Sequence, residues 1–151
     1  MGTLMLLRHG ETTFNAAQVF TGLLDADLAP SGEAQMRIAA QLIAAEGLEP
    51  EVLWQSTMWR AARTTELLLG HLGCTDVPVQ ATWRLVERGY GCFTGLGKAE
   101  ARHRYGEELF FQWRRTVHGR PPDAEPDVVA TWSDPAPVAE RGPLEAGAGE
   151  S

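Results

Sequence analysis

A short apolar run that ends abruptly in charged residues sets the first limit on the fold. Residues 3–7 are mostly apolar, and Arg8, His9 and Glu11 follow almost directly. The run is too short for a membrane span, which needs about 18 apolar residues or more, and it lacks the basic start of a signal peptide. We therefore expect a buried β-strand at the start of a globular chain.

Further strands and helices alternate along the chain. We expect strands at residues 52–54 and 77–80, and helices at residues 31–47, 58–71 and 98–117. Strands that alternate with helices predict an α/β fold, here a three-layer α/β/α arrangement with a mostly parallel sheet.

Two of these helices carry an apolar face. In the first, Met36, Ala39, Ala40 and Ile43 lie on one side, and Gly47 ends the pattern. In the last, the residues expected to stack at a spacing of four are Tyr105, Leu109, Trp113 and Val117.

The C-terminal part has a different composition. Residues 119–151 hold seven acidic and two basic residues, hence five of the seven excess negative charges, together with six prolines. Such a segment buries too little apolar surface to offset its ordering entropy. We therefore predict a folded domain at residues 1–122 and a disordered, acidic, Pro/Gly/Ala-rich tail at residues 123–151.

Charge and cysteine usage narrow the choice of partner and compartment. The formal net charge of −7 makes nucleic acid or an anionic membrane a poor partner for the surface as a whole. Cys74 and Cys92 form no CxxC pattern, which favours a reducing cytoplasm over a disulfide framework.

The first candidate site follows the first strand. In an α/β fold, ligands bind beyond the carboxyl ends of the strands, where Arg8, His9, Gly10 and Glu11 are expected. An imidazole with one free nitrogen can attack phosphorus, and a neighbouring Arg can hold an anion. Gly10 leaves room for a ligand to approach closely. The alternative is a solvent-exposed strand end without a function.

The second candidate site lies at the start of the helix that follows residues 52–54. Free N–H groups, the helix dipole and Arg60 there predict an anion site. Arg63 lies three residues further on and can pair with Glu66 instead. The alternative is a basic, solvated helix face.

The third cluster contains a carboxylate among basic residues. Glu87 beside a phosphate would suit a proton donor and acceptor for a substrate hydroxyl, and Arg88 and Tyr90 could hold the rest of the substrate. Lys98 and the pair Arg114-Arg115 add three cations. The alternatives are a surface ion pair and a favourable contact with a helix C-terminus.

Together, these segments resemble one known family. They read LLRHGETTFN from residue 6, FTG from 20, STMWRAART from 56, WRLVERGYG from 83, GLGKAE from 95, YGEE from 105 and WRRTVHGRPP from 113. In order and spacing they are similar to the cofactor-dependent phosphoglycerate mutases of the histidine phosphatase superfamily. The resemblance extends from Leu4 to about Pro122.

The resemblance implies a role for each matching residue. His9 would be the phosphohistidine nucleophile, and Glu87 the proton donor and acceptor. Arg8 and Arg60 would clamp the phosphoryl group. The remaining positions that match substrate-binding residues are Gly10, Glu11, Asn15, Thr21, Gly22, Arg88, Tyr90, Lys98, Arg114 and Arg115. The resemblance also implies phosphoglycerates as substrates, 2,3-bisphosphoglycerate as primer and no metal. Family members are often homo-oligomers, but the sequence leaves the oligomeric state of this chain open.

One part of the family pattern is missing. The family has a second catalytic His in an AHGN-like segment of its C-terminal half, and this chain has no such segment. We therefore expect the fold to lack the family's C-terminal strand and helix, and the site to lose a group worth about 10²–10³ in rate. His71, His103 and His118 do not follow an apolar strand and are predicted to lie on the surface.

Several functions are compatible with this pattern. The leading hypothesis is a phosphoglycerate mutase that interconverts 2- and 3-phosphoglycerate in glycolysis and gluconeogenesis. The alternatives are a histidine phosphatase, a weakly active or non-catalytic homologue that binds phosphoglycerate or a protein partner, and a fragment that barely folds.

Overall fold

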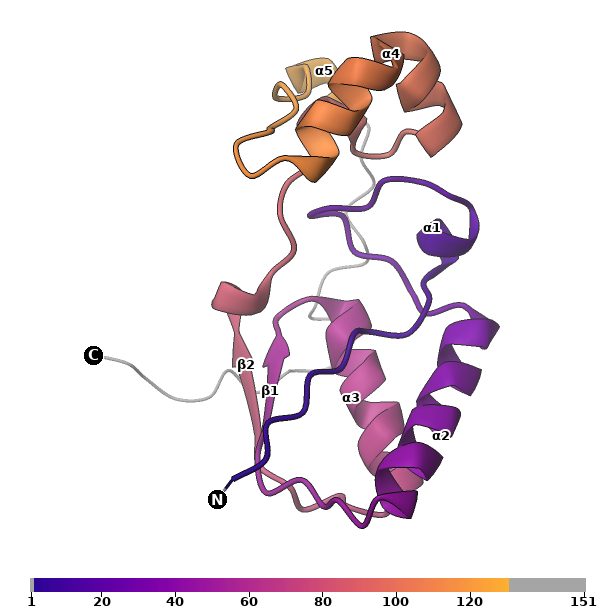
Figure 1. Cartoon of the computed structure of the whole chain (residues 1–151), viewed down its shortest axis with the longest axis vertical. Coiled ribbons are helices and arrows are strands. Elements are labelled where there is room, and N and C mark those ends of the chain that lie inside the picture. Colours follow the sequence, from indigo (N-terminus) through magenta and orange to yellow (C-terminus); the bar gives the residue numbers. More distant parts are fainter. Residues whose placement is uncertain (1, 131–151) are drawn as a thin grey trace, which may run out of the picture.

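The computed structural model describes residues 2–130, with helices beside a small two-stranded sheet and further helices at the other end of the molecule (Figure 1). The helices are α1 (Thr13–Ala16), α2 (Pro30–Ala45), α3 (Trp59–Leu72), α4 (Lys98–Arg115) and α5 (Pro126–Ala130), and the strands are β1 (Leu53–Ser56) and β2 (Val79–Thr82). Two 3₁₀ turns, Trp83–Leu85 and Gly91–Phe93, lie between β2 and α4.

The sheet is parallel and is built from one strand–helix–strand unit. β1 pairs with β2 so that Leu53 lies opposite Val79, and α3 connects the two strands. α3 packs on β1 and also on α2, which lies beside it in Figure 1. The predicted α/β class with a parallel sheet is confirmed, and both strands begin one or two residues later than the sequence pattern suggested.

The pair α2 and α3 forms one hydrophobic core. Ala40 and Ile43 of α2 pack with Leu68 of α3, and Met36 is buried on the same face of α2. The predicted apolar face of α2 is therefore confirmed. Gly47, with a φ of +64°, follows the end of this helix, a conformation that suits a residue without a Cβ.

The strand predicted at residues 3–7 is absent from the structure. This segment has no regular secondary structure, and the backbone of residues 2–8 makes no hydrogen bond to any other residue between 2 and 130. Leu4 and Leu6 are 83% and 86% exposed, whereas Met5 and Leu7 are 39% and 44% exposed. Exposure thus alternates as in a strand, but the segment lacks the neighbouring strand that would complete it.

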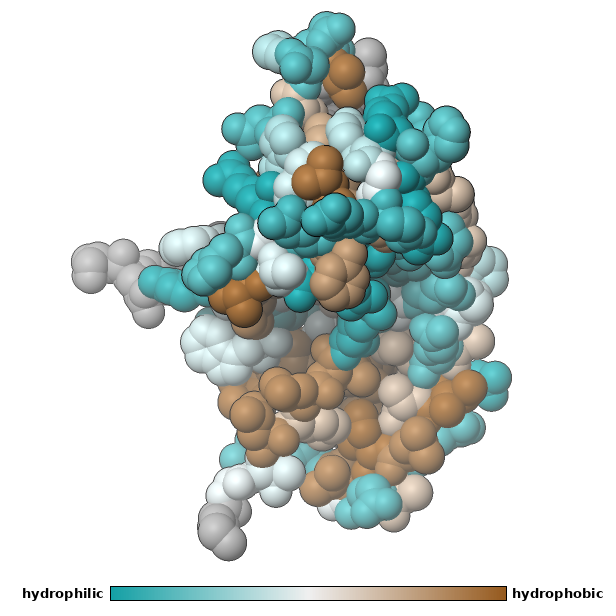
Figure 2. Space-filling view, turned by 45° about the horizontal axis from the view of Figure 1, so that its top comes forward, coloured by the Kyte–Doolittle hydropathy of each residue, from teal (hydrophilic) through white to brown (hydrophobic). Residues whose placement is uncertain are grey.

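The exposed side chains of this segment contribute to an apolar surface. Figure 2 shows hydrophobic residues gathered on one part of the molecule, whereas the region of α4 is mostly hydrophilic. Other large apolar side chains of the sheet region, Val52, Trp54, Val79, Trp83 and Leu85, are also exposed. The prediction of a buried first strand was wrong because the described residues leave the face with Leu4 and Leu6 uncovered.

A second, aromatic core lies under α4. Phe20, Phe93, Ala101 and Phe110 are buried together, and Tyr90, Tyr105 and Trp113 pack around them.

The predicted stacking along this helix is only partly correct. Tyr105 and Trp113 contact each other, but Leu109 is 40% exposed and Val117 94% exposed. Gly106 has a non-helical backbone (φ 80°, ψ 160°) that kinks α4. The kink breaks the spacing of 3.6 residues per turn and brings Phe110 rather than Leu109 to the core.

The boundary proposed at residue 122 falls between two ordered parts of the described chain. Pro121 is buried, the Pro122 carbonyl accepts a hydrogen bond from the Cys92 N–H, and Pro126–Ala130 form α5. The remainder of the predicted tail, residues 131–151, lies outside the described residues. No helix within residues 2–130 is long and apolar enough to cross a membrane.

Candidate active site

A pocket of about 130 Å³ opens where the N-terminal segment, the loop before α2 and both ends of α4 meet. Predicted site residues that line it are Arg8, His9, Asn15, Thr21, Gly22, Arg60, Glu87, Tyr90, Lys98 and Arg114. Residues more than a hundred positions apart thus meet in one place.

The His9 imidazole is oriented by its own backbone surroundings. Nδ1 lies 2.7 Å from the Gly10 carbonyl oxygen, which can only accept a hydrogen bond. The proton of a neutral ring therefore sits on Nδ1, and Nε2 keeps its lone pair. Burial lowers the pKa of His9 below 6.5, and the charges of Arg60 and Arg8 lower it further, against the Gly10 hydrogen bond and Glu87. The ring is therefore neutral and nucleophilic at neutral pH.

Four cations, Arg8, Arg60, Lys98 and Arg114, line the same pocket. Burial lowers the pKa of Lys98, and the nearby Arg114, Arg8 and Arg115 add to this effect. Burial and the neighbouring Arg115 likewise lower the pKa of Arg114. The mutual repulsion of these groups indicates an electropositive site that would bind an anion.

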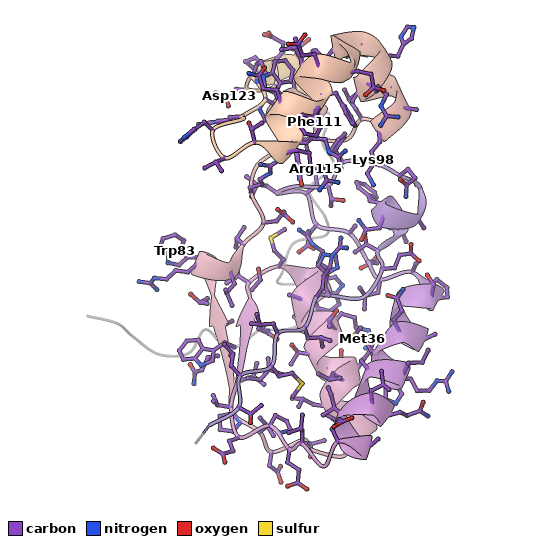
Figure 3. The ribbon with its side chains drawn as sticks, in the orientation of Figure 1. Met36, Trp83, Lys98, Phe111, Arg115 and Asp123 are labelled. Atoms are coloured by element: carbon purple, nitrogen blue, oxygen red, sulfur yellow. The ribbon has the colours of Figure 1, made fainter. Side chains whose placement is uncertain are left out.

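Arg114 and Lys98 are held by α4. The Arg114 guanidinium lies 5.2 Å from the centre of the Phe20 ring and 4.8 Å from that of Phe110. Lys98 Nζ donates to Gln18 Oε1 at 3.1 Å. Figure 3 shows Lys98 and Arg115 on the side of α4 that faces the rest of the chain.

Arg60 is almost completely buried and is held by the loop that precedes α2. Its Nη1 donates to the Leu24 carbonyl at 2.9 Å and to Asp25 Oδ1 at 3.4 Å, and its Nη2 donates to the Gly22 carbonyl at 3.1 Å. Asp25 also accepts the backbone N–H groups of Trp59 and Arg60. The first turn of α3 is thus occupied by a carboxylate of the chain itself, so the prediction of a free anion site at this helix end was wrong.

Arg63 behaves as predicted. It is not among the residues that line the pocket, and it pairs with Glu66 at 2.7 Å and with Glu33 of α2 at 3.1 Å.

Gly10 has a different role from the predicted one. Its backbone is buried against α2, and a Cβ at this position would lie 2.7 Å from the carbonyl oxygen of Gly32. Its N–H donates to Thr64 Oγ1 at 3.0 Å. The missing side chain therefore allows two backbone segments to cross, rather than a ligand to approach.

Three further predicted residues do not line the pocket. Glu11 accepts from the Ser31 hydroxyl at 2.6 Å, at the start of α2. Arg88 donates to the carbonyls of Trp113 and Arg114 at 3.2 and 2.9 Å, so it caps the C-terminal end of α4. Arg115 acts on the pocket through its charge.

Sequence reasoning missed other residues of the site. Thr12, Val19 and Phe20 line the pocket. Thr12 and Asn15 form a capping box at α1, because each side chain accepts the backbone N–H of the other. The spacing of these two residues, Thr12-x-x-Asn15, could have indicated this turn. The other histidines, His71, His103 and His118, are exposed as predicted.

Comparison with known proteins gives the family. Residues 4–132 match the family model of the histidine phosphatase superfamily (branch 1). The chain belongs to this superfamily. The resemblance noted in the sequence is thereby confirmed.

The relatives found by sequence comparison are named phosphoglycerate mutases, whereas the similar solved structures include a phosphatase. The chain is 43% identical to a 2,3-bisphosphoglycerate-dependent phosphoglycerate mutase of Corynebacterium kroppenstedtii, over 88% of this chain and 54% of that protein. It is also 43% identical to the enzyme of the same name from Thermobifida fusca, over 89% of this chain and 55% of that protein. A mycobacterial glucosyl-3-phosphoglycerate phosphatase solved with VO3 superposes with a TM-score of 0.65 and 26% identity, over 75% of this chain and 53% of that one.

The chain spans about half the length of the histidine phosphatases that it matches. Within the shared half, the α/β fold agrees with the solved members of the superfamily.

Proposed function

We propose that this protein is a phosphoryl-transfer enzyme, a 2,3-bisphosphoglycerate-dependent phosphoglycerate mutase that interconverts 2- and 3-phosphoglycerate through phosphohistidine at His9. One observation carries the proposal: a neutral imidazole with its Nε2 lone pair free lies in a pocket lined by four cations. This combination suits attack on the phosphorus of an anionic ester.

The chemistry can be followed atom by atom. His9 Nε2 attacks phosphorus and forms a P–N bond, while the ester P–O bond breaks and its electron pair goes to the leaving oxygen. Glu87, which also lines the pocket, would give that oxygen a proton and later remove one from the hydroxyl that takes the phosphoryl group back. The roles of both residues are part of the proposal.

The cations would hold the substrate. A phosphoglycerate carries a carboxylate and a phosphate of about −1.5 to −2 charges at neutral pH. Arg60 belongs to α3, and Lys98 and Arg114 lie near opposite ends of α4, so the three side chains can contact different groups of one ligand. Catalysis would then depend mainly on positioning and on fixed positive charge.

The proposed cofactor is 2,3-bisphosphoglycerate, which would supply the first phosphoryl group to His9. The names of the relatives and the charge of the pocket support this choice. Among the described residues, no three His, Cys, Asp or Glu side chains gather in a way that could hold a metal ion. Three statements remain predictions. They are a cytoplasmic location, assembly as a homo-oligomer, and the absence of nucleic-acid and membrane partners.

The decisive experiment is the transfer of a phosphoryl group to the protein. The chain is incubated with 2,3-bisphosphoglycerate and its intact mass is measured under alkaline conditions, which preserve phosphohistidine. We expect one added phosphoryl group on the wild type and on His71→Asn, whose ring is exposed, but none on His9→Asn. A wild-type chain that gains no mass while the Thermobifida fusca relative does would refute the proposal.

Hydrolysis is the second candidate activity. The mycobacterial phosphatase that superposes on this chain favours it, because the shared half can belong to an enzyme that passes the phosphoryl group to water. Incubating the phosphorylated protein with 3-phosphoglycerate distinguishes the two activities. A mutase yields 2-phosphoglycerate and a phosphatase yields inorganic phosphate. Binding of 3-phosphoglycerate without transfer would identify a non-catalytic homologue.

A further inference from the structure

The geometry points to Asp25 as a positioning residue for phosphoryl transfer. Its carboxylate joins the loop before α2 to the first turn of α3 and fixes the orientation of Arg60 toward His9. This inference rests on the proposed function, since it concerns the same pocket, but Asp25 itself does not line that pocket.

Asp25 is a well-connected and nearly buried carboxylate. Its two oxygens accept the backbone N–H groups of Trp59 and Arg60 at the start of α3, and Oδ1 also accepts the N–H of Ala26 at 3.1 Å. The side chain is only 13% exposed, and its ion pair with Arg60 measures 3.4 Å. One carboxylate thus holds a helix, a loop and a guanidinium together.

The guanidinium of Arg60 is left with donors for a ligand. Its contacts with Leu24, Asp25 and Gly22 use three of its five N–H groups. The remaining donors belong to a side chain that is 5% exposed and lines the pocket. Because the three contacts define the plane of the guanidinium, they also define where those donors point.

The same loop carries two further residues of the pocket. Thr21 and Gly22 line it, and Gly22 is also the residue whose carbonyl accepts from Arg60. A Cβ on Gly22, at a φ of +56°, would lie 3.0 Å from the Tyr90 ring. Asp25 therefore fixes the position of the loop that carries Thr21 and Gly22 relative to α3, and not only the side chain of Arg60.

A helix cap and a positioning charge can be separated by substitution. Asp25→Asn keeps one acceptor oxygen, which can still accept the Arg60 backbone N–H, but the amide nitrogen that replaces the other oxygen cannot accept the Trp59 N–H, so we expect a modest loss of melting temperature. It removes the negative charge that holds Arg60. The Arg60 charge then attracts anions more freely but is no longer held in one orientation.

We expect Asp25→Asn to affect phosphate affinity and the rate of phosphoryl transfer differently. Titration calorimetry with inorganic phosphate should give an affinity for Asp25→Asn that is equal to or higher than that of the wild type. The single-turnover rate of His9 phosphorylation at saturating 2,3-bisphosphoglycerate should fall about ten-fold or more. The matched control is Glu33→Gln, which removes the same charge from an ion pair outside the pocket and should leave both values unchanged.

Two results would overturn the inference. One is a phosphorylation rate for Asp25→Asn equal to that of the wild type. The other is a parallel loss of melting temperature, phosphate affinity and rate, which would mean that Asp25 only stabilises the fold.

A second measurement does not depend on catalysis. In ¹⁵N NMR spectra, a guanidinium held by three contacts should give separate signals for its two Nη groups, and these should average in Asp25→Asn. Separate signals in both proteins would overturn the inference. If the wild type takes up no phosphoryl group but the signals average as expected, the proposed function fails while the role of Asp25 in orienting Arg60 stands.

Discussion

Replacing Phe93 tests whether the aromatic core beneath α4 assembles the pocket. Phe93 is fully buried, and its ring centre lies 5.0 Å from that of Phe20 and 5.6 Å from that of Trp113. Phe20 lines the pocket, and Trp113 lies beside Arg114 on α4. The ring therefore connects the pocket-lining segment around Phe20 with α4, which carries Lys98 and Arg114.

The size of the effect follows from burial. Truncating a fully buried Phe to Ala typically costs about 3–5 kcal/mol, of which each lost aromatic pair contributes about 0.5–1.5 kcal/mol. Since a domain is stable by only about 5–15 kcal/mol, Phe93→Ala should remove a large part of the free energy of unfolding. The control is Phe111→Ala on the same helix, which is 62% exposed and should change stability by about 0.5 kcal/mol or less.

The assay is urea denaturation followed by tryptophan fluorescence. Phe93→Leu, which keeps an apolar side chain in place, should cost about 1.5 kcal/mol or less and gives a folded variant if the Ala variant does not fold. The same proteins are then titrated with inorganic phosphate, and only the Phe93 variants should bind more weakly. Equal losses of stability for Phe93→Ala and Phe111→Ala would refute the assignment of this ring to a core.

Three further results are expected. Gly32→Ala should destabilise the chain strongly, because its Cβ would clash with the neighbouring backbone, whereas Gly70→Ala in the open part of α3 should stabilise it by about 0.5–1 kcal/mol; thermal melts compare the two. Arg8→Gln should raise the pKa of His9 toward 6.5 in an NMR titration, because Arg8 helps to lower it, and Arg63→Gln should leave that pKa unchanged. Since the folded-state pKa of His9 is lowered, the free energy of unfolding should fall as the pH drops from 6.5 through that pKa; His9→Asn should lose this dependence, which denaturation at several pH values would measure.

Local patterns predicted the helical core well. The spacing of Met36, Ala40 and Ile43 is set by one regular helix, so each of them reached the core. The same reasoning failed for Leu109, because Gly106 changes the helical phase within α4. A rule based on a constant number of residues per turn holds only as far as the helix is continuous.

Long-range contacts limited what could be predicted of the site. Most of the residues that line the pocket were predicted because they belong to motifs, but no pattern connected Asp25 with the first turn of α3, 34 positions away. Arg60 is buried, and a buried guanidinium needs an acidic or carbonyl partner. Which partner it has depends on how the loop before α2 folds back, and this is a property of the tertiary structure.

The backbone hydrogen bonds on the two sides of His9 differ. His9 follows seven residues whose backbone makes no hydrogen bond within the described chain, while Gly10 after it is anchored to Thr64. Within the described residues, the backbone that carries the imidazole is thus held by hydrogen bonds on its C-terminal side only. Amide hydrogen exchange should therefore change sharply at this point, from fast before His9 to slow at Gly10.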